Sequence, residues 1–282
     1  MSSNHDTLFR AVERMPAFPK SVQRVLALTS DMQCSPKDLV EVIKHDPIFT
    51  LKILKVVNSP YIGLVQKITS IHQAAVYLGL NTLKNIALNL ATIGTLPKTN
   101  KAEFDMNAFW AHSLAVASAA QKIGEMRLTP DAEPEDLFSV GLMHDIGKVV
   151  FALYMPKEFR QALAMVQDGL MSLHDAELEI FGANHADIGA LLAEKWDLPE
   201  TLVQGIALHH SPFTEDPVPL GDCVFAANQL CKMLAFGFAG EYEVEQLPKA
   251  MQERLTMDLE GIMSALPDME EELSKANVFI HA

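Results

Sequence analysis

The chain has 282 residues, which is enough for one large or two ordinary domains with a sizeable core. Hydrophobic residues make up 49% of it and aromatic residues only 7%, and the abundance of Leu, Ala and Met favours helices over sheets. A formal net charge of −14 argues against a general nucleic-acid-binding protein and against a protein that binds anionic membranes.

The charge is unevenly distributed along the chain. Residues 1–105 carry 12 Lys and Arg against 8 Asp and Glu, a net charge of +4. Residues 106–240 carry 7 against 18 (−11), and residues 241–282 carry 3 against 10 (−7). This pattern predicts an N-terminal helical lobe (1–105), a second helical part (106–240) and an acidic helical C-terminal extension (241–282).

The cysteines and the lengths of the apolar runs indicate the cellular location that we expect for this protein. Cys34, Cys223 and Cys231 are scattered without paired spacing, so they predict neither a disulfide framework nor a zinc knuckle. The N-terminus does not have the pattern of a signal peptide, and no charge-free run of about 18 apolar residues occurs. We expect a cytoplasmic protein that neither spans nor binds a membrane.

In chain order, the first 105 residues predict short helices with tight joints. Asp46-Pro47 has the pattern of an N-cap followed by proline at the first helical position. A helix beginning at Ser70 is expected to stop at Gly79, with another helix following to about residue 93. The charged segment Pro97–Asp105 is the predicted linker.

The second part predicts longer helices. They cover about 106–127, 134–154, 156–168, 172–181, 185–196, 199–210 and 219–236. The alternation typical of strands is scarce. The fold class expected is therefore all-α, with an N-terminal helical lobe followed by a helical bundle.

One predicted helix, 134–154, carries charge in an apolar setting. Apolar residues run almost unbroken around His144, Asp145 and Lys148. An unpaired charge in a buried helix is very costly, so an internal ion pair, a metal or a ligand is required. On a helix all three side chains would point into one sector. A structural Asp–Lys pair with a core histidine remains an open alternative.

Four more histidines stand in similar surroundings: His112, His185, His209 and His210. Each alone is more often structural, but one bundle could aim all of them inward from separate helices. Imidazole with carboxylate suits Fe, Mn, Zn or Ni. The adjacent pairs His144-Asp145 and His209-His210 diverge by about 100° on a helix and could each serve two neighbouring metals, an arrangement used in phosphoester cleavage. The remaining histidines are assigned no role: His5, His45, His72, His174 and His281.

At these residues the sequence resembles the HD superfamily, named after a His-Asp doublet. It is more closely similar to the HDOD family, helical output domains of bacterial signalling proteins related to the HD-GYP cyclic-di-GMP phosphodiesterases. The resemblance covers about residues 15–235 and rests on motifs in the same order: Pro16-Ala-Phe-Pro19, His45-Asp46-Pro47, Val57-Asn58-Ser59-Pro60, Leu78-Gly79, Trp110-Ala-His112, Gly141-Leu-Met-His-Asp-Ile-Gly147, Phe181-Gly182, His185 and His209-His210. It implies a helical lobe followed by an HD-type bundle.

The chain departs from the pattern of the HD phosphohydrolases at two places. Those enzymes close the metal site with a second aspartate on a later helix, where this chain has Asn228, a neutral and poorer ligand. Asp222 lies six residues earlier and is not expected to replace it. The Gly-Tyr-Pro loop is also missing, and residues 211–219 stand in its place.

Two functions therefore compete. The resemblance implies a regulatory or protein-interaction module of bacterial signal transduction on a degenerate phosphohydrolase scaffold, with a signalling protein as partner. For this module one or two divalent ions are optional. The alternative is a metal-dependent phosphohydrolase acting on a phosphorylated small molecule, a nucleotide or a cyclic dinucleotide. In that enzyme Asp145 and Lys148 would carry catalytic roles, Lys148 by offsetting phosphoryl charge. In both readings the expected metal ligands are His112, His144, Asp145, His185, His209 and His210.

Overall fold

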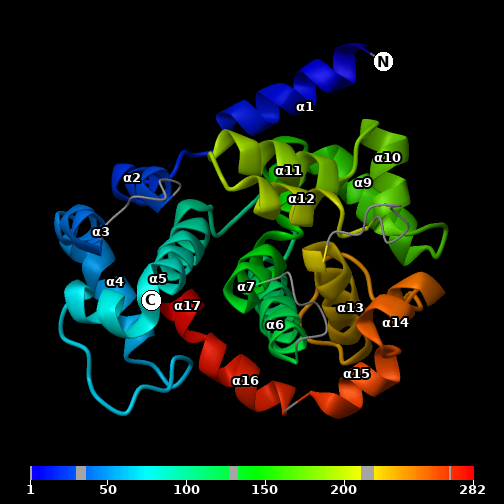
Figure 1. The fold of residues 1–282 in the computed structure, drawn as a ribbon. Coiled ribbons are helices and arrows are strands. Elements are labelled where there is room, and N and C mark those ends of the chain that lie inside the picture. The colour runs from blue at the N-terminus through cyan, green and yellow to red at the C-terminus, as the bar shows by residue number, and fades with distance from the viewer. Residues whose placement is uncertain (1, 30–35, 127–132, 211–218, 267) are drawn as a thin grey trace. The chain divides into compact units, whose positions relative to one another are not determined.

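A computed structural model describes residues 2–29, 36–126, 133–210, 219–266 and 268–282 (Figure 1). Helices are the only regular elements in these ranges, which confirms the all-α fold class. Contacts divide the chain into two compact units. We call Met1–Met15 with Pro97–Pro267 the bundle unit, and Pro16–Leu96 with Asp268–Ala282 the small unit. Each unit is made of two separate stretches of the chain. The expected division into domains at residues 105 and 240 stays a prediction.

The small unit is built around one long helix, α5 (Ile71–Thr95). Its other helices are α2 (Lys20–Thr29), α3 (Pro36–Lys44), α4 (Pro47–Val57), α16 (Met269–Ala276) and α17 (Val278–His281). The helices α2, α3 and α4 all pack on α5. The expected helix stop at Gly79 is confirmed: its φ of 81° and ψ of 166° are not helical, so α5 consists of two helices that meet at a kink there.

A hydrogen-bonded cap begins α4, as the Asp46-Pro47 pattern predicts. Asp46 Oδ1 accepts from the backbone N–H of Phe49 at 3.0 Å, and Ser21 Oγ donates to Asp46 Oδ2 at 2.9 Å. The cap therefore also ties the start of α2 to the start of α4.

The bundle unit contains the remaining helices. They are α1 (Ser2–Arg14), α6 (Met106–Glu125), α7 (Pro134–Met143), α8 (Ile146–Tyr154), α9 (Pro156–Gln167), α10 (Leu173–Phe181), α11 (His185–Lys195), α12 (Glu200–Ala207), α13 (Pro219–Met233), α14 (Lys249–Leu255) and α15 (Leu259–Ala265). Helix α6 lies against α7 and α13, and α11 lies against α8 and α12 (Figure 1).

Two glycines let the central helices approach closely. A Cβ on Gly141 would lie 2.7 Å from the Cα of Ala117, so α7 can lie directly on α6 only without a side chain there. A Cβ on Gly147 would overlap the backbone oxygen of His185. The first turn of α8 is therefore pressed against the first turn of α11, and this contact positions the site described below.

Helix α1 is fixed to α11 by one lysine. Lys195 Nζ donates to the carbonyl oxygens of Val12 at 2.9 Å, Glu13 at 2.5 Å and Met15 at 3.1 Å. The last carbonyls of a helix have no partner within the helix, and a cation there is favourable. This contact therefore caps α1.

The predicted helix 134–154 is two helices, because α7 ends at Met143 and α8 begins at Ile146. The stretch Pro134–Tyr154 is long and apolar enough to cross a membrane, but 89% of its most apolar window is buried within the protein. Such burial is typical of a core helix. Cys223 and Cys231 are buried, as expected for core cysteines. Cys34 and residues 211–218 lie outside the described residues.

Candidate metal centre

The expected metal ligands come together in the bundle unit from four places in the chain. His112 lies in α6, and His185 is the first residue of α11. The doublet His144-Asp145 forms the turn between α7 and α8, and His209 and His210 follow the end of α12.

The expectation that each adjacent pair lies on a helix is therefore wrong. Asp145 has φ −94° and ψ 8°, outside the helical region, and α12 ends at Ala207. The turn at His144-Asp145 lies between Gly141 and Gly147, the two glycines that allow close contacts with α6 and α11. A turn frees the doublet from helical spacing, so neighbouring side chains can point to the same centre.

Asp145 is the centre of the cluster and is completely buried. Its Oδ1 lies 3.1 Å from His185 Nε2 and 3.7 Å from His209 Nε2. Its Oδ2 lies 3.3 Å from His144 Nε2 and 4.0 Å from His112 Nε2. Lys148 Nζ donates to the same Oδ2 at 2.8 Å, so the Asp–Lys pair that the sequence left open exists inside the histidine cluster.

The backbone fixes which nitrogen of two histidines is free. His144 Nδ1 donates to the carbonyl of Gly141 at 2.8 Å, and His209 Nδ1 donates to that of Ile206 at 2.6 Å. A carbonyl can only accept, so each neutral ring presents an unprotonated Nε2. Both Nε2 atoms and Asp145 Oδ1 are buried without a hydrogen-bond partner among the described residues. Buried acceptors without donors are what a cation site requires.

The donor atoms fall into two groups that share Asp145. One group is His112, His144 and Asp145, and the other is Asp145, His185, His209 and His210. Within each group the donor atoms lie within 4.8 Å of one another. Neutral imidazoles with one carboxylate suit Fe, Mn, Zn or Ni, so the residues fit one or two divalent ions.

The sequence patterns missed Glu177 of α10. Its Oε2 accepts from His185 Nδ1 at 2.5 Å and from the His185 backbone N–H at 2.8 Å. A carboxylate on the far nitrogen of a histidine orients the ring toward a metal and raises its basicity. The signal was present, because Glu177 stands on the helix face that also buries Leu173 and Phe181.

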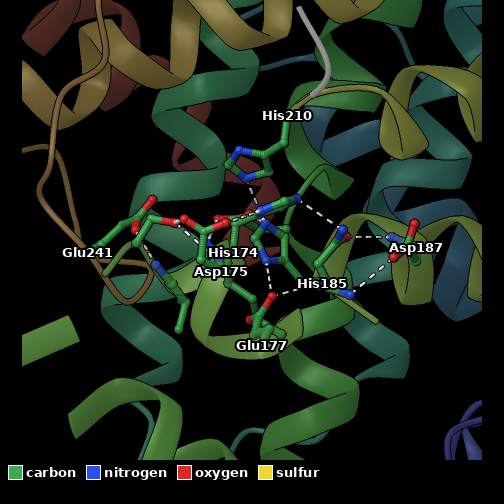
Figure 2. A network of polar contacts seen from close by, with 12 residues as sticks. His174, Asp175, Glu177, His185, Asp187, His210 and Glu241 are labelled. Atoms are coloured by element: carbon green, nitrogen blue, oxygen red, sulfur yellow. Dashed lines mark hydrogen bonds and ion pairs between the residues drawn. The ribbon is translucent and has the colours of Figure 1, made fainter. Parts of the chain in front are cut away.

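His174 was also missed. Figure 2 shows it beside the contact between His185 and His210, whose Nε2 atoms lie 2.9 Å apart. The ring centroids of His174 and His210 are separated by 5.1 Å, and Asn184 Nδ2 lies 3.0 Å from His174 Nε2. His174 therefore lies outside the shared donor groups, at their edge.

Asn228 of α13 faces the same centre. Its Oδ1 lies 3.0 Å from His112 Nε2, while His112 Nδ1 lies 3.2 Å from the carbonyl of Phe236. Asp222, which was not expected to replace a ligand, is paired instead with Arg254 at 2.5 and 2.8 Å.

Burial and charge set the protonation states. Burial lowers the pKa of His112 and of His209 to about 3. Burial would raise the pKa of Asp145, but His144 and Lys148 beside it hold that pKa well below its ordinary value. Burial opposes a charge on His185, but the Glu177 carboxylate raises its pKa. His112, His209 and Asp145 are therefore in the protonation states that bind metal.

Comparisons with known proteins agree with this architecture. A family model described as the HDOD domain matches residues 15–212. An uncharacterised protein of Treponema pallidum (strain Nichols) is 25% identical over 243 residues, which cover 85% of this chain and 46% of that protein. The chain thus spans about half the length of that relative.

Solved structures match over nearly the whole chain. An HDOD-domain protein of unknown function from Geobacter sulfurreducens is 25% identical with a TM-score of 0.78, and the match covers 97% of this chain and 98% of that one. A candidate phosphohydrolase from Shewanella amazonensis SB2B has the same fold, at 23% identity, a TM-score of 0.76 and the same coverage. Together with the family match over residues 15–212, the likeness leads to one conclusion: the chain belongs to the HDOD family.

Proposed function

We propose that this chain is a regulatory module of bacterial signal transduction whose HD-type centre binds one or two divalent ions and hydrolyses phosphoesters very slowly or not at all. The proposal extends to a signalling protein as partner and to a cytoplasmic location, in keeping with scattered cysteines that have no paired spacing.

The observation that carries the proposal is Asn228. Its amide oxygen lies 3.0 Å from His112 Nε2. By the resemblance to the HD phosphohydrolases, this is the position of their second aspartate. Asp145 is then the single carboxylate in the two donor groups. One negative charge offsets little of the charge of two divalent ions, so the His112 group would hold its ion weakly.

The chain's own residues would divide the work around Asp145. Its two oxygens face the two donor groups, and Lys148 holds the carboxylate in place at 2.8 Å. Glu177 orients His185, and backbone carbonyls orient His144 and His209. A divalent ion bound there would supply Lewis-acid and water-activating chemistry.

An active phosphohydrolase is the second candidate. The carboxylate shared between two donor groups and the buried lysine beside it favour this function. The candidate phosphohydrolase from Shewanella amazonensis has a similar fold. The substrate would be a phosphorylated small molecule or nucleotide.

The test is metal content by elemental analysis after purification without chelator. The wild-type chain should contain one or two transition-metal ions, and His144→Ala should lose most of this metal, because a donor atom is removed from the buried group. The matched control is His45→Ala, which removes an exposed histidine from the doublet His45-Asp46 and should leave the metal content unchanged. Equal metal in all three proteins would contradict the proposed site.

Catalysis is tested on the metal-loaded wild-type chain with added Mn²⁺. We expect hydrolysis of a cyclic dinucleotide far below the order of 1 s⁻¹. Turnover at or above that rate would favour the enzyme over the regulatory module.

A further inference from the structure

A cavity of about 840 Å³ opens beside the metal centre. Its wall is formed by the end of α9, the start of α10 and the segment 238–245, and His210 belongs to the wall. His210 also belongs to the second donor group, with its Nε2 2.9 Å from His185 Nε2. A small molecule in the cavity would therefore lie next to any ion in that group.

Among the described residues, the lining of this cavity carries carboxylates and neither Lys nor Arg. Its acidic members are Asp175, Glu241, Glu243 and Glu245. Figure 2 shows Asp175 and Glu241 on one side of the His185–His210 contact and Asp187 on the other. The wall is thus negative where a binder of polyanions would need positive charge.

The four carboxylates are not equivalent. Glu241 is buried, receives the Leu173 backbone N–H at 2.8 Å and pairs with Lys232 at 2.5 Å. Asp175 accepts from Ser172 Oγ at 2.9 Å. Glu243 and Glu245 are exposed, and neither side chain has a partner in the described part of the chain. Their charges are free to act on whatever enters the cavity.

Two aromatic rings complete this wall. Phe238 and Tyr242 lie with ring centroids 4.7 Å apart, and Tyr242 is 58% exposed. An aromatic face attracts an organic cation, and adjacent carboxylates strengthen that attraction.

Lys148, which lies at the donor groups, is already paired with a carboxylate of the site. Lys148 is buried and bound to Asp145, so it is not available to a second phosphate. A cyclic dinucleotide, with two phosphodiesters, would have to place one of them against carboxylates. Like charges placed together exclude the wrong ligand.

We propose that the cavity selects a compact ligand with one oxyanion, directed at the metal centre, and one organic ammonium group, directed at Glu243, Glu245 and the Phe238–Tyr242 pair. Glu243 and Glu245 are then the specificity-determining residues. The oxyanion half of this inference rests on the proposed metal-binding function, and the ammonium half does not.

The test is titration calorimetry on the full chain loaded with Mn²⁺. The probes are phosphocholine, glycerol 3-phosphate and cyclic di-GMP, which share a phosphate and differ in the charge of the body. We expect phosphocholine to bind roughly fivefold more tightly than glycerol 3-phosphate, a factor suited to an exposed cation–π contact with partly screened ion pairs. Binding of cyclic di-GMP should be undetectable.

The variants locate the selectivity. In Glu243→Gln/Glu245→Gln the preference for phosphocholine should fall to within about twofold, with the metal content unchanged. The control Glu179→Gln/Glu253→Gln removes two exposed carboxylates outside the cavity lining and should keep the wild-type preference. A wild-type chain that binds glycerol 3-phosphate or cyclic di-GMP as tightly as phosphocholine, or a preference that survives in the cavity variant, would overturn the inference.

A chain that holds no metal would overturn the proposed function instead. Titration of the metal-free chain with choline alone then tests whether the cavity recognises the ammonium group. Binding of choline to the wild type that weakens in the cavity variant supports charge selection, and equal binding to both proteins overturns it.

Discussion

The dipeptide His-Asp occurs four times in the chain, and two of the copies, His45-Asp46 and His144-Asp145, have contrasting environments. In the small unit, His45 is exposed and Asp46 is a half-buried helix cap, bound to the Phe49 N–H and to Ser21. In the bundle unit, His144 and Asp145 are fully buried, and four histidines and a lysine approach the Asp145 carboxylate within 4.0 Å.

The difference lies in the surroundings rather than in the doublet. Among the residues that the structure describes, every buried charged side chain lies in the bundle unit. The small unit uses its carboxylate to begin a helix, which requires only nearby N–H groups and a hydroxyl. A function in metal binding requires convergence of several chain segments, and of these two doublets it is His144-Asp145 that has it.

The largest effect should come from Asp145→Ala. Lys148 would remain buried without its partner, and leaving a buried charge unpaired costs about 3–5 kcal/mol of unfolding free energy. Urea denaturation of the metal-free protein measures this loss. The double variant Asp145→Ala/Lys148→Met should recover much of it, and a double variant no more stable than the single one would show that the ion pair is not the cause.

The next largest effect is a dependence of metal-free stability on pH. His112 and His209 have pKa values of about 3 in the folded chain, against 6.5 when unfolded, so only the unfolded chain gains their protons as the pH falls below 6.5. Between pH 7 and pH 5 each should cost on the order of 2 kcal/mol. The raised pKa of His185 acts in the opposite direction.

Urea denaturation at the two pH values in the presence of a chelator measures this dependence. The variant His209→Gln should show a shallower loss than the wild type. A wild-type chain equally stable at pH 7 and pH 5 would contradict burial as the dominant influence on these rings.

A smaller effect is expected from Asn228→Asp, which adds a carboxylate 3.0 Å from His112 Nε2. Metal affinity should rise about tenfold, because supporting carboxylates commonly change affinity by 10–100-fold. Competition with a fluorescent chelator measures it. The isosteric Asn228→Leu tests the opposite direction and should not tighten binding. Equal affinities in all three would place residue 228 outside the metal's influence.

The smallest effect belongs to the other doublet. Asp46→Ala removes the cap of α4 and should cost about 1 kcal/mol, while Asp46→Asn keeps an oxygen for the Phe49 N–H and should cost less. Neither should change the metal content. Loss of metal in either variant would contradict the assignment of Asp46 to structure alone.

The fold class and the convergent residues could be predicted from the sequence because each depends on local pattern. Apolar periodicity gives the helices, and buried histidines in separate helices indicate a common centre. The turns at His144-Asp145 and after Ala207 could not be predicted, because they follow from contacts between helices, such as Gly147 against the His185 carbonyl.

Glu177 and His174 were missed for the same reason. The spacing of Glu177 from Leu173 and Phe181 indicates that it is buried, but it does not identify His185 as its partner. His174 stands near His210 only because α10 packs where the chain after α12 turns. Contacts between segments that are far apart in the chain produce no regular residue spacing in the sequence, so they cannot be predicted from it.

The lysine cap on α1 has a practical consequence for protein production. The family match begins at residue 15 and ends at residue 212, so an expression fragment cut to those limits would omit α1 and α13. Lys195 would lose the carbonyls of Val12 and Glu13, and His112 would lose its contact with Asn228. Such a fragment would be a poor substitute for the chain in metal or ligand assays. A negative result from it would follow from the missing contacts and would not test the proposed site.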